Sequence, residues 1–432
     1  MVEHLSSQEE VRTRLVPVLL GADLLIYSYI RSFHETYGLE HKAIVLTTKD
    51  VKIVSSSKFC DYRAIDGVDK DDVLMDELLK IGAELKEQGL VGIVLGSGDW
   101  YARTLSKNKD RLQEFYFVPY NDFELLDYLT QKDEFQALCD KSDLRHPITL
   151  ELDCSAEAPR WDYDMHGIEF PCIAKPSNSA AWHFAQFEGK RKIHEPQSMD
   201  ELRQLYDTLR DHTSFDRKLL VQDMIPGGDD SILNLNAYID ASGKATYKVL
   251  GQVVLQDHAP TGLGNPVCVI DAFRSPQLRD RQEAMRDMMD KAIRMVAAKG
   301  YRGWANFDVK YDVRDGSFNL FEINTRPGRC SYYISLSGMP FVKPIIEDFV
   351  LGNQMPEPPE VQEFCLACIP SLVVRNYVTD EALRDYVLNA YAKGWAIDPV
   401  LYERDGFVHG FWAKATTTNQ IRKFDRYLGS AS

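Results

Sequence analysis

Apolar runs alternate with amphipathic segments over the first hundred residues, and this alternation restricts the possible folds more than any other feature of the chain. The apolar runs read LVPVLLGAD, AIVLTT and VGIVLGSGD, and the segments between them, IYSYIRSFHETYG and DDVLMDELLKIGAELKEQG, carry apolar residues at helical spacing. Strands and helices in this order are typical of a parallel sheet that is covered by helices. We therefore expect a parallel α/β domain at residues 1–125.

Small and acidic residues follow two of these expected strands. Gly21 and Asp23 come after the first strand, and Asp99 comes after the third. Open parallel sheets bind ligands at the carboxyl ends of their strands, so these three residues are candidate substrate-binding residues. Glycines at such places fit equally well with tight turns that bind nothing.

The elements expected after this domain come in a different order. A helix is expected at 123–141, strand-like runs follow at CIAKPS, LLVQDMI, ILNLNAYID and KVLGQVVLQD, and a long amphipathic helix at 276–299 precedes two more strand candidates. Consecutive strands without intervening helices favour an antiparallel α+β arrangement. The proline-rich piece MPEPPEV is typical of a linker. We expect an α+β region at 126–354 and a small α/β appendage at 355–432.

Composition and charge exclude several classes of protein. The 432 residues carry a formal net charge of −15, which argues against nucleic acid or an anionic membrane as the main partner. The apolar runs are shorter than the roughly 20 residues that span a bilayer. The charged start MVEHLSSQEEVRTR has no signal-peptide core, so we expect a cytoplasmic protein without stable membrane insertion. Of eight cysteines, only Cys365 and Cys368 are close in sequence, and nothing completes a zinc site around them, so we expect reduced thiols.

The stretch LFEINTRPGR, residues 320–329, begins like a buried strand and ends in charged groups. Side chains two residues apart on a strand share a face, so Glu322 and Asn324 point the same way. A three-residue loop at 314–316, with its glycine in the left-handed conformation, would pair this strand with the preceding one and place Asp308 directly opposite Glu322. A two-residue loop would put the two carboxylates on opposite faces, so the length of the turn decides the chemistry.

Two carboxylates and an amide converge if the three-residue loop forms. Carboxylates this close repel each other, which raises a pKa unless a cation lies between them. Oxygen ligands without His or Cys suit Mg²⁺ that is bound mainly through the phosphates of a nucleotide. Asp308, Glu322 and Asn324 are therefore the candidate metal ligands. The alternative is a solvated sheet face that carries unrelated polar residues.

A lysine and a loop rich in small residues precede this hairpin. The segment FPCIAKPSNSAAWHF places Lys175 at the end of an apolar strand, with Ser177 and Ser179 in the loop that follows. The backbone N–H groups of such a loop can approach phosphates closely while the lysine supplies positive charge. About 45 residues later, LLVQDMIPGGDDSI reads as an apolar strand that ends in polar residues and a turn.

Together these segments resemble the ATP-grasp superfamily of carboxylate-amine ligases, and the resemblance covers most of the chain. It implies an ATP-grasp fold behind an N-terminal pre-ATP-grasp domain, with ATP and Mg²⁺ as cofactors. The residues that look like the family's functional positions, in family order, are Lys132, Lys175, Ser177 and Ser179 for the phosphates, Gln222, Asp223 and Ile225 in the adenine hinge, Asp229 or Asp230 for the ribose, and Asp308, Glu322 and Asn324 for the metal.

Three positions depart from the family pattern. Gln222 stands where the hinge often has Glu, so the adenine contact depends more on backbone groups. Asn306 stands where some relatives have an arginine, two residues before the first metal carboxylate. Outside the family context, Lys132 would be read as a surface lysine of an amphipathic helix.

A narrower resemblance, to the bacterial D-aspartate ligase group, comes from GADLLIYSYIRSFHETYG and FDVKYDVRDGSFNLFEINTRPGRCSYYISLSG. That group joins an amino acid to the side-chain amine of the peptidoglycan stem peptide. The resemblance implies an acylphosphate made with ATP, release of ADP and phosphate, catalytic roles for Arg326 and Arg329, and a donor site lined by Arg329 and Ser331. The resemblance is also compatible with a homodimer. The alternatives are salt bridges of the two arginines within a loop, a ligase for another amino acid or small carboxylate, and a non-catalytic ATP-binding module.

Overall fold

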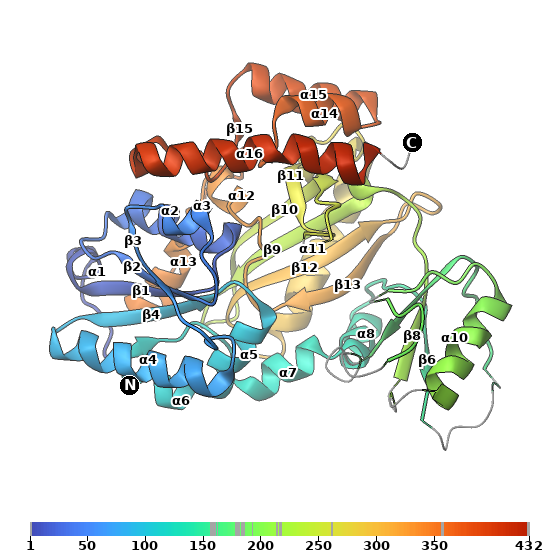
Figure 1. The fold of residues 1–432 in the computed structure, drawn as a ribbon, viewed down its shortest axis with the longest axis horizontal. Coiled ribbons are helices and arrows are strands. Elements are labelled where there is room, and N and C mark those ends of the chain that lie inside the picture. Colours follow the sequence, from blue (N-terminus) through green and yellow to red (C-terminus); the bar gives the residue numbers. More distant parts are fainter. Residues whose placement is uncertain are drawn as a thin grey trace.

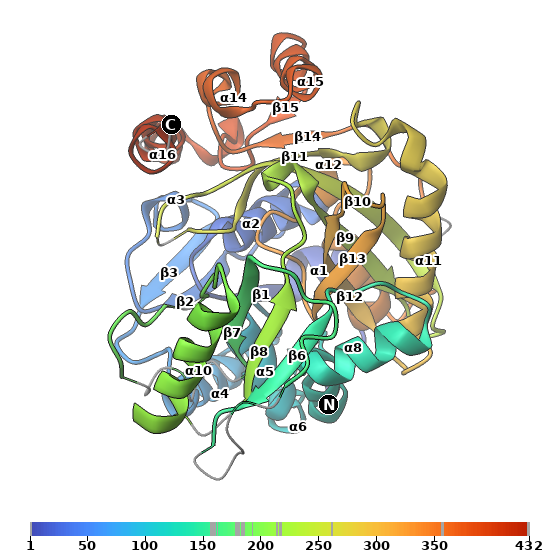
Figure 2. The ribbon, with the colours of Figure 1, turned by 90° about the vertical axis from the view of Figure 1, so that its right-hand side faces the viewer.

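The chain folds around three sheets, as the computed structural model shows (Figures 1 and 2). The structure describes residues 2–155, 161, 163–177, 182, 186–191, 193–212, 215, 218–260, 262–355 and 358–429. Within these ranges, no helix is both long and apolar enough to cross a membrane. The eight cysteines are free thiols, and all but Cys368 are buried.

The first sheet has five parallel strands in the order β3-β2-β1-β4-β5, which confirms the α/β arrangement expected from the alternation. Every residue of β1, β2 and β4 is buried, because apolar clusters cover both faces of the sheet. The strands are β1 (Leu15–Leu20), β2 (Ala43–Thr47), β3 (Cys60–Ala64), β4 (Val91–Gly96) and β5 (Tyr116–Phe117). The helices of this part are α1 (Gln8–Arg14), α2 (Leu24–Tyr37), α3 (Lys52–Ser55), α4 (Asp71–Glu87), α5 (Asp99–Lys107) and α6 (Lys109–Leu112).

The second sheet has seven strands in the order β13-β12-β9-β10-β11-β14-β15, and all its pairs except β14–β15 are antiparallel. One face packs against α2 and the segment 330–350, and the other packs against α8 and α11. The long predicted helix is α11 (Gln282–Ala297), shorter than expected because a 3₁₀ turn (Arg279–Arg281) takes the place of its first part. The strands are β9 (Ile232–Ile239), β10 (Ala245–Gln256), β11 (Pro266–Asp271), β12 (Gly303–Tyr311), β13 (Phe318–Asn324), β14 (Cys365–Ala367) and β15 (Ala396–Ile397).

A small third sheet, in the order β6-β8-β7, forms a lobe with α10 beside the main body (Figure 1). The single helix predicted at 123–141 is wrong, because Gln131 adopts an extended conformation (ψ 128°) and separates two helices. Lys132 is consequently the first residue of α8. The elements are β6 (Thr149–Asp153), β7 (Cys172–Pro176), β8 (Lys218–Asp223), α7 (Phe123–Thr130), α8 (Lys132–Lys141) and α10 (Met199–His212).

The last part of the chain extends the second sheet and covers its edge. β14 and β15 add two strands beyond β11, and three helices pack over them (Figure 2). The helices after β13 are α12 (Tyr333–Leu336), α13 (Lys343–Ile345), a π-helical turn (Ile346–Val350), α14 (Ser371–Tyr377), α15 (Glu381–Ala392), the 3₁₀ turn η5 (Glu403–Asp405) and α16 (Phe407–Tyr427).

Candidate active site

The β12–β13 hairpin brings the predicted metal ligands together. Asp308 pairs directly with Glu322, and Asn324 lies on the same face two residues further along β13. The predicted three-residue loop is wrong. Tyr311 pairs with Phe318, so the pairing of the two strands beside the loop is shifted by one residue from the expected register. A β-bulge between the turn and the site adds one residue, Phe321, on β13 and restores the register at Glu322. Asp308 and Glu322 therefore share a face because the shift beside the loop and the bulge at Phe321 cancel each other.

Asp308 is held by two amides. Its Oδ1 accepts a hydrogen bond from Asn234 Nδ2 (2.6 Å), and its Oδ2 accepts one from Asn324 Nδ2 (3.2 Å). Burial and the facing carboxylate of Glu322 raise the pKa of Asp308 to about 7. Two carboxylates opposite each other are thus electrostatically strained as long as no cation lies between them.

The chemistry of this donor set fits a hard divalent cation. The Nδ2 of Asn324 donates to Asn306 Oδ1 (3.0 Å) and to Asp308, so its own carbonyl oxygen stays available beside the two carboxylates. Oxygen ligands of this kind suit Mg²⁺ better than a soft metal. In the described ranges, no group of three or more His, Cys, Asp or Glu side chains is arranged to hold a metal. A cation bound here would therefore need further oxygens, as Mg²⁺ obtains from nucleotide phosphates.

Two lysines from different elements adjoin this face. Lys132 begins α8, and Lys175 lies on β7 of the small sheet. Burial and the neighbouring ammonium group of Lys132 lower the pKa of Lys175 to about 8, while the carboxylate of Glu322 opposes the shift. Lys175 therefore interacts with both Lys132 and Glu322, which places positive charge beside the carboxylates.

The loop after β7 is described only at its start. Ser177 is exposed, and its N–H donates to Lys218 O (2.9 Å) on β8. Ser179 lies outside the described residues. The predicted contribution of both serines to phosphate binding stays a prediction.

The side chains of the predicted adenine hinge are already engaged. Gln222 is buried, and its Nε2 donates to Thr149 Oγ1 (2.8 Å) on β6. The carboxylate of Asp223 forms an ion pair with Arg314 (2.7 Å), which reaches it from the β12–β13 loop. Ile225 is buried. Any adenine contact from Gln222 or Asp223 would thus come from the backbone or need a rearrangement of these side chains.

Asp229 and Asp230 lie in a 3₁₀ turn before β9 and have different partners. Asp229 Oδ2 accepts from Gln256 N (2.8 Å) and contacts His258 Nε2 (2.9 Å). Asp230 Oδ2 accepts from Gln277 Nε2 (2.9 Å). Both carboxylates are therefore held in place by neighbouring strands and loops.

The two arginines after β13 meet the loops of the first sheet. Arg326 Nη2 forms an ion pair with Asp99 Oδ1 (2.8 Å), and Arg326 Nη1 donates to Pro327 O (3.0 Å). Burial raises the pKa of Asp23, and the positive charges of Arg329 and Arg326 oppose that shift. The Nε atoms of Arg326 and Arg329 are buried, and neither has a hydrogen-bond partner in the described part of the chain. Two buried guanidinium N–H donors without a partner indicate a place for an anion.

The remaining predicted substrate residues have structural roles as well. Asp23 is the N-cap of α2 and accepts from Leu25 N (3.0 Å) and Ile26 N (3.3 Å). Gly21 has a φ of +106°, and a Cβ there would collide with Ser97 Oγ, so the glycine is required by the turn itself. Ser331 is buried, and its Oγ donates to Asn236 Oδ1 (3.5 Å).

Several polar residues of this face were not predicted. β9 places Asn234 opposite Asp308 and Asn236 opposite Asn306, so that the amides extend the polar face to a third strand. Burial lowers the pKa of Lys310. The negative charges of Asp229, Asp312 and Asp230 oppose this shift. Two signals were available in the sequence: the alternating asparagines of ILNLNAYID, and the two-residue spacing from Asp308 to Lys310.

Comparisons with known proteins identify the family of the chain. No protein-family model matches. The D-aspartate ligase of Enterococcus faecium (strain Aus0004) is 31% identical over 350 residues, which cover 79% of this chain and 78% of that protein.

Two solved structures share the fold. An N5-carboxyaminoimidazole ribonucleotide synthetase in complex with ADP superimposes with a TM-score of 0.55 at 12% identity, covering 84% of this chain and 82% of that chain. An L-amino acid ligase from Bacillus licheniformis superimposes with a TM-score of 0.52 at 14% identity, covering 81% and 75%. The sequence relative and these structures show that the chain has the ATP-grasp fold and belongs to the D-aspartate ligase family.

Proposed function

We propose that this protein is an ATP-dependent carboxylate–amine ligase that joins D-aspartate to an amine through an acylphosphate and releases ADP and phosphate. The observation that carries the proposal is the pairing of Asp308 with Glu322 between two sets of cations, the lysines of α8 and β7 and the arginines after β13. Phosphoryl transfer requires this combination, because catalysis consists mainly of positioning and neutralising negative charge. We expect the reaction in the cytoplasm, where ATP is available.

The polar face of the second sheet and the two lysines would hold the triphosphate. Lys132 and Lys175 would neutralise the α and β phosphates, and Asp308, Glu322 and Asn324 would hold Mg²⁺. When bound, the cation supplies charge neutralisation between phosphate oxygens. The hinge backbone at Asp223 and Ile225 would receive the adenine, and Asp229 or Asp230 the ribose.

The two arginines would receive the donor. Arg326, held by Asp99, would orient the transferring phosphoryl group or the reacting carboxylate, and Arg329 with Ser331 would bind the second carboxylate of an acidic amino acid. A carboxylate oxygen of the donor attacks the γ-phosphorus, the bond to the β–γ bridging oxygen breaks, and ADP leaves. The amine then attacks the acyl carbon, and phosphate leaves as the amide forms.

The acceptor follows from the family resemblance. We propose the side-chain amine of a lysine in a peptidoglycan precursor peptide, as in the D-aspartate ligase group. An ATP-consumption screen of D and L amino acids, each with a lysine-containing muramyl pentapeptide, tests the donor and the acceptor together, and mass spectrometry identifies the product. The expected result is one amide product with D-aspartate and stoichiometric ADP. AMP as the product would exclude the proposed chemistry, and the absence of turnover with every pair would favour a non-catalytic nucleotide-binding module.

Binding of ATP without Mg²⁺ should weaken as the pH rises from about 7 to about 9.5. The pKa of Lys175 is lowered to about 8 by burial and by Lys132, so its charge is lost in this window, whereas an ordinary lysine stays charged up to about pH 10.4. We expect the Kd measured by calorimetry to increase several-fold across the window. Lys175→Met should weaken binding at pH 7 and remove most of the pH dependence above about pH 8, where Asp308, with a pKa of about 7, is already ionised; the exposed Lys80→Met serves as the control. An unchanged pH profile in Lys175→Met would place the titrating group elsewhere.

A further inference from the structure

The loop at 257–265, of which the structure describes every residue except 261, joins β10 to β11 and reaches one of the two candidate ribose residues. His258 Nε2 lies 2.9 Å from Asp229 Oδ2, and the same oxygen accepts from Gln256 N (2.8 Å). The orientation of the Asp229 carboxylate therefore depends on where this loop lies.

Asp229 interacts with the polar face of the second sheet more strongly than Asp230 does. Lys310 shares that face with Asp308, because the two residues are two positions apart on β12. Of the carboxylates whose charges oppose the lowered pKa of Lys310, Asp229 has the largest effect and Asp230 a smaller one. The ribose of a nucleotide lies between its base and its phosphates, so Asp229 is the better candidate for the ribose hydroxyls.

The loop is organised around the carboxylate of Asp257, which is only 4% exposed. Its Oδ1 accepts from Ala259 N (2.9 Å), and its Oδ2 accepts from Lys423 Nζ (2.5 Å) of α16. Gly262 packs so closely against this carboxylate that a Cβ there would lie 2.3 Å from Oδ2. A buried carboxylate requires a paired charge, and α16 supplies it.

The next residue of α16 contacts the next residue of the loop. The rings of Phe424 and His258 meet edge to face, with centroids 6.2 Å apart and an interplanar angle of 73°. Phe424 is buried in an apolar cluster that also contains Leu255 of β10 and Val267 of β11. Figure 1 shows α16 running across the top of the molecule above these two strands. One turn of the C-terminal helix thus fixes both Asp257 and His258.

We propose that α16 is a positioning element of the nucleotide site, in which Lys423 and Phe424 hold the loop at 257–265 so that His258 orients Asp229 toward the ribose hydroxyls. The inference rests on the proposed nucleotide site. It gives the C-terminal appendage a part in nucleotide recognition, although no residue of α16 would touch the nucleotide. Lys423 and Phe424 are positioning residues, and Asp229 is the residue that binds.

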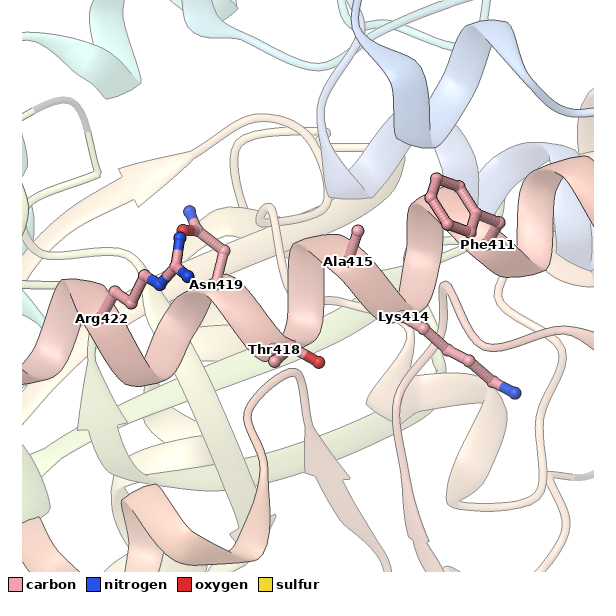
Figure 3. A pocket seen from close by; sticks show the side chains of 6 residues that line it. All are labelled: Phe411, Lys414, Ala415, Thr418, Asn419 and Arg422. Atoms are coloured by element: carbon pink, nitrogen blue, oxygen red, sulfur yellow. The ribbon is translucent and has the colours of Figure 1, made fainter.

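A different side of α16 provides the controls. Six of its side chains line a shallow groove of about 400 Å³, and Lys414 and Arg422 are among them (Figure 3). In the part of the chain that the structure describes, the lining of this groove includes neither Lys423 nor Phe424. Lys414→Met therefore makes the same chemical change as Lys423→Met on the same helix, at an exposed position away from the loop.

Calorimetric titration of the full-length protein with ADP and with 2′,3′-dideoxy-ADP, both with Mg²⁺, tests the proposal. The second nucleotide lacks both ribose hydroxyls, so wild type should bind ADP at least about tenfold more tightly, as expected for hydrogen bonds to a charged group. Lys423→Met should reduce this preference to within about threefold by weakening ADP binding alone. Lys423→Arg and Lys414→Met should keep the preference. An equal loss of affinity for both nucleotides in Lys423→Met, or a wild type without preference, would overturn the proposal.

His258→Ala tests the same chain of contacts without leaving Asp257 unpaired. It should reduce the preference for ADP as much as Lys423→Met does, and the double variant should lose no more than either single variant, because both act through Asp229. Additive losses would overturn the proposal.

Asp229→Asn should also remove most of the preference, whereas Asp230→Asn should keep it, and the reverse result would overturn the assignment of Asp229. Amide formation is not measured in these titrations, so a wrong donor or acceptor would leave their outcome unchanged.

Discussion

Glu322→Gln should lower the rate of ATP-dependent amide formation by about 100-fold or more. The substitution keeps the shape of the side chain and removes one of the two charges that face each other across the hairpin. Loss of a charge-stabilising group at a phosphoryl-transfer centre typically costs 10²–10³ in rate. Steady-state kinetics at saturating ATP and donor measures the effect, and part of the loss should be recovered by raising the Mg²⁺ concentration.

Glu283→Gln is the matched control for this substitution. It makes the same chemical change at an exposed position of α11, which packs against the opposite face of the same sheet. We expect activity within about twofold of wild type and an unchanged free energy of unfolding. A Glu322→Gln enzyme that keeps most of its activity would show that Glu322 is not part of the phosphoryl-transfer centre.

Arg329→Ala should lower kcat/KM for D-aspartate by about 10- to 100-fold, mainly through a higher KM for the donor. The buried Nε of Arg329 has no partner among the described residues, so the guanidinium is free to hold the carboxylate that does not react. A hydrogen bond to a charged group contributes about 1.5–3 kcal/mol, which corresponds to this range. Arg329→Lys should recover only part of the loss, because an ammonium group cannot make the planar two-point contact.

The KM for ATP separates binding of the donor from binding of the nucleotide in this variant. It should change little in Arg329→Ala, since the charge of Arg329 acts on Asp23, whereas Lys175 interacts with Lys132 and Glu322. The exposed Arg279→Ala provides the control for loss of a positive charge. A rise in the KM for ATP with an unchanged KM for D-aspartate would contradict the donor role.

The chemistry of the hairpin was predictable from the sequence, but its register was not. Glu322 and Asn324 share a face because strand side chains alternate, a rule that needs only their spacing. The position of Asp308 opposite Glu322 depends on the loop and on the bulge at Phe321. The prediction reached the correct pair from a wrong loop, because the bulge restores the register, and neither a bulge nor a loop length is determined by local residue preferences.

Contacts between distant segments account for what was missed. Asn234 joins the site because β9 pairs with β12, and strand order within a sheet is a tertiary property. The helix predicted at 123–141 is interrupted at Gln131, a residue with good helix propensity, so the break arises from how α7 and α8 pack and not from Gln131 itself. The ordered set of lysines, hinge and carboxylates was more informative than any single motif, because only the whole set predicted the fold that the structure and its relatives share.

Transfer of ¹⁸O from the donor carboxylate tests the central claim most directly. D-aspartate labelled with ¹⁸O in both carboxylates is incubated with the enzyme, ATP, Mg²⁺ and the lysine-containing peptide, and the released phosphate is analysed by mass spectrometry. Activation as an acylphosphate places a carboxylate oxygen between carbon and phosphorus, and attack of the amine expels phosphate with that oxygen, so we expect one ¹⁸O in each phosphate formed. Phosphate without the label, released together with an amide product or without any amide, would contradict the proposed ligase mechanism.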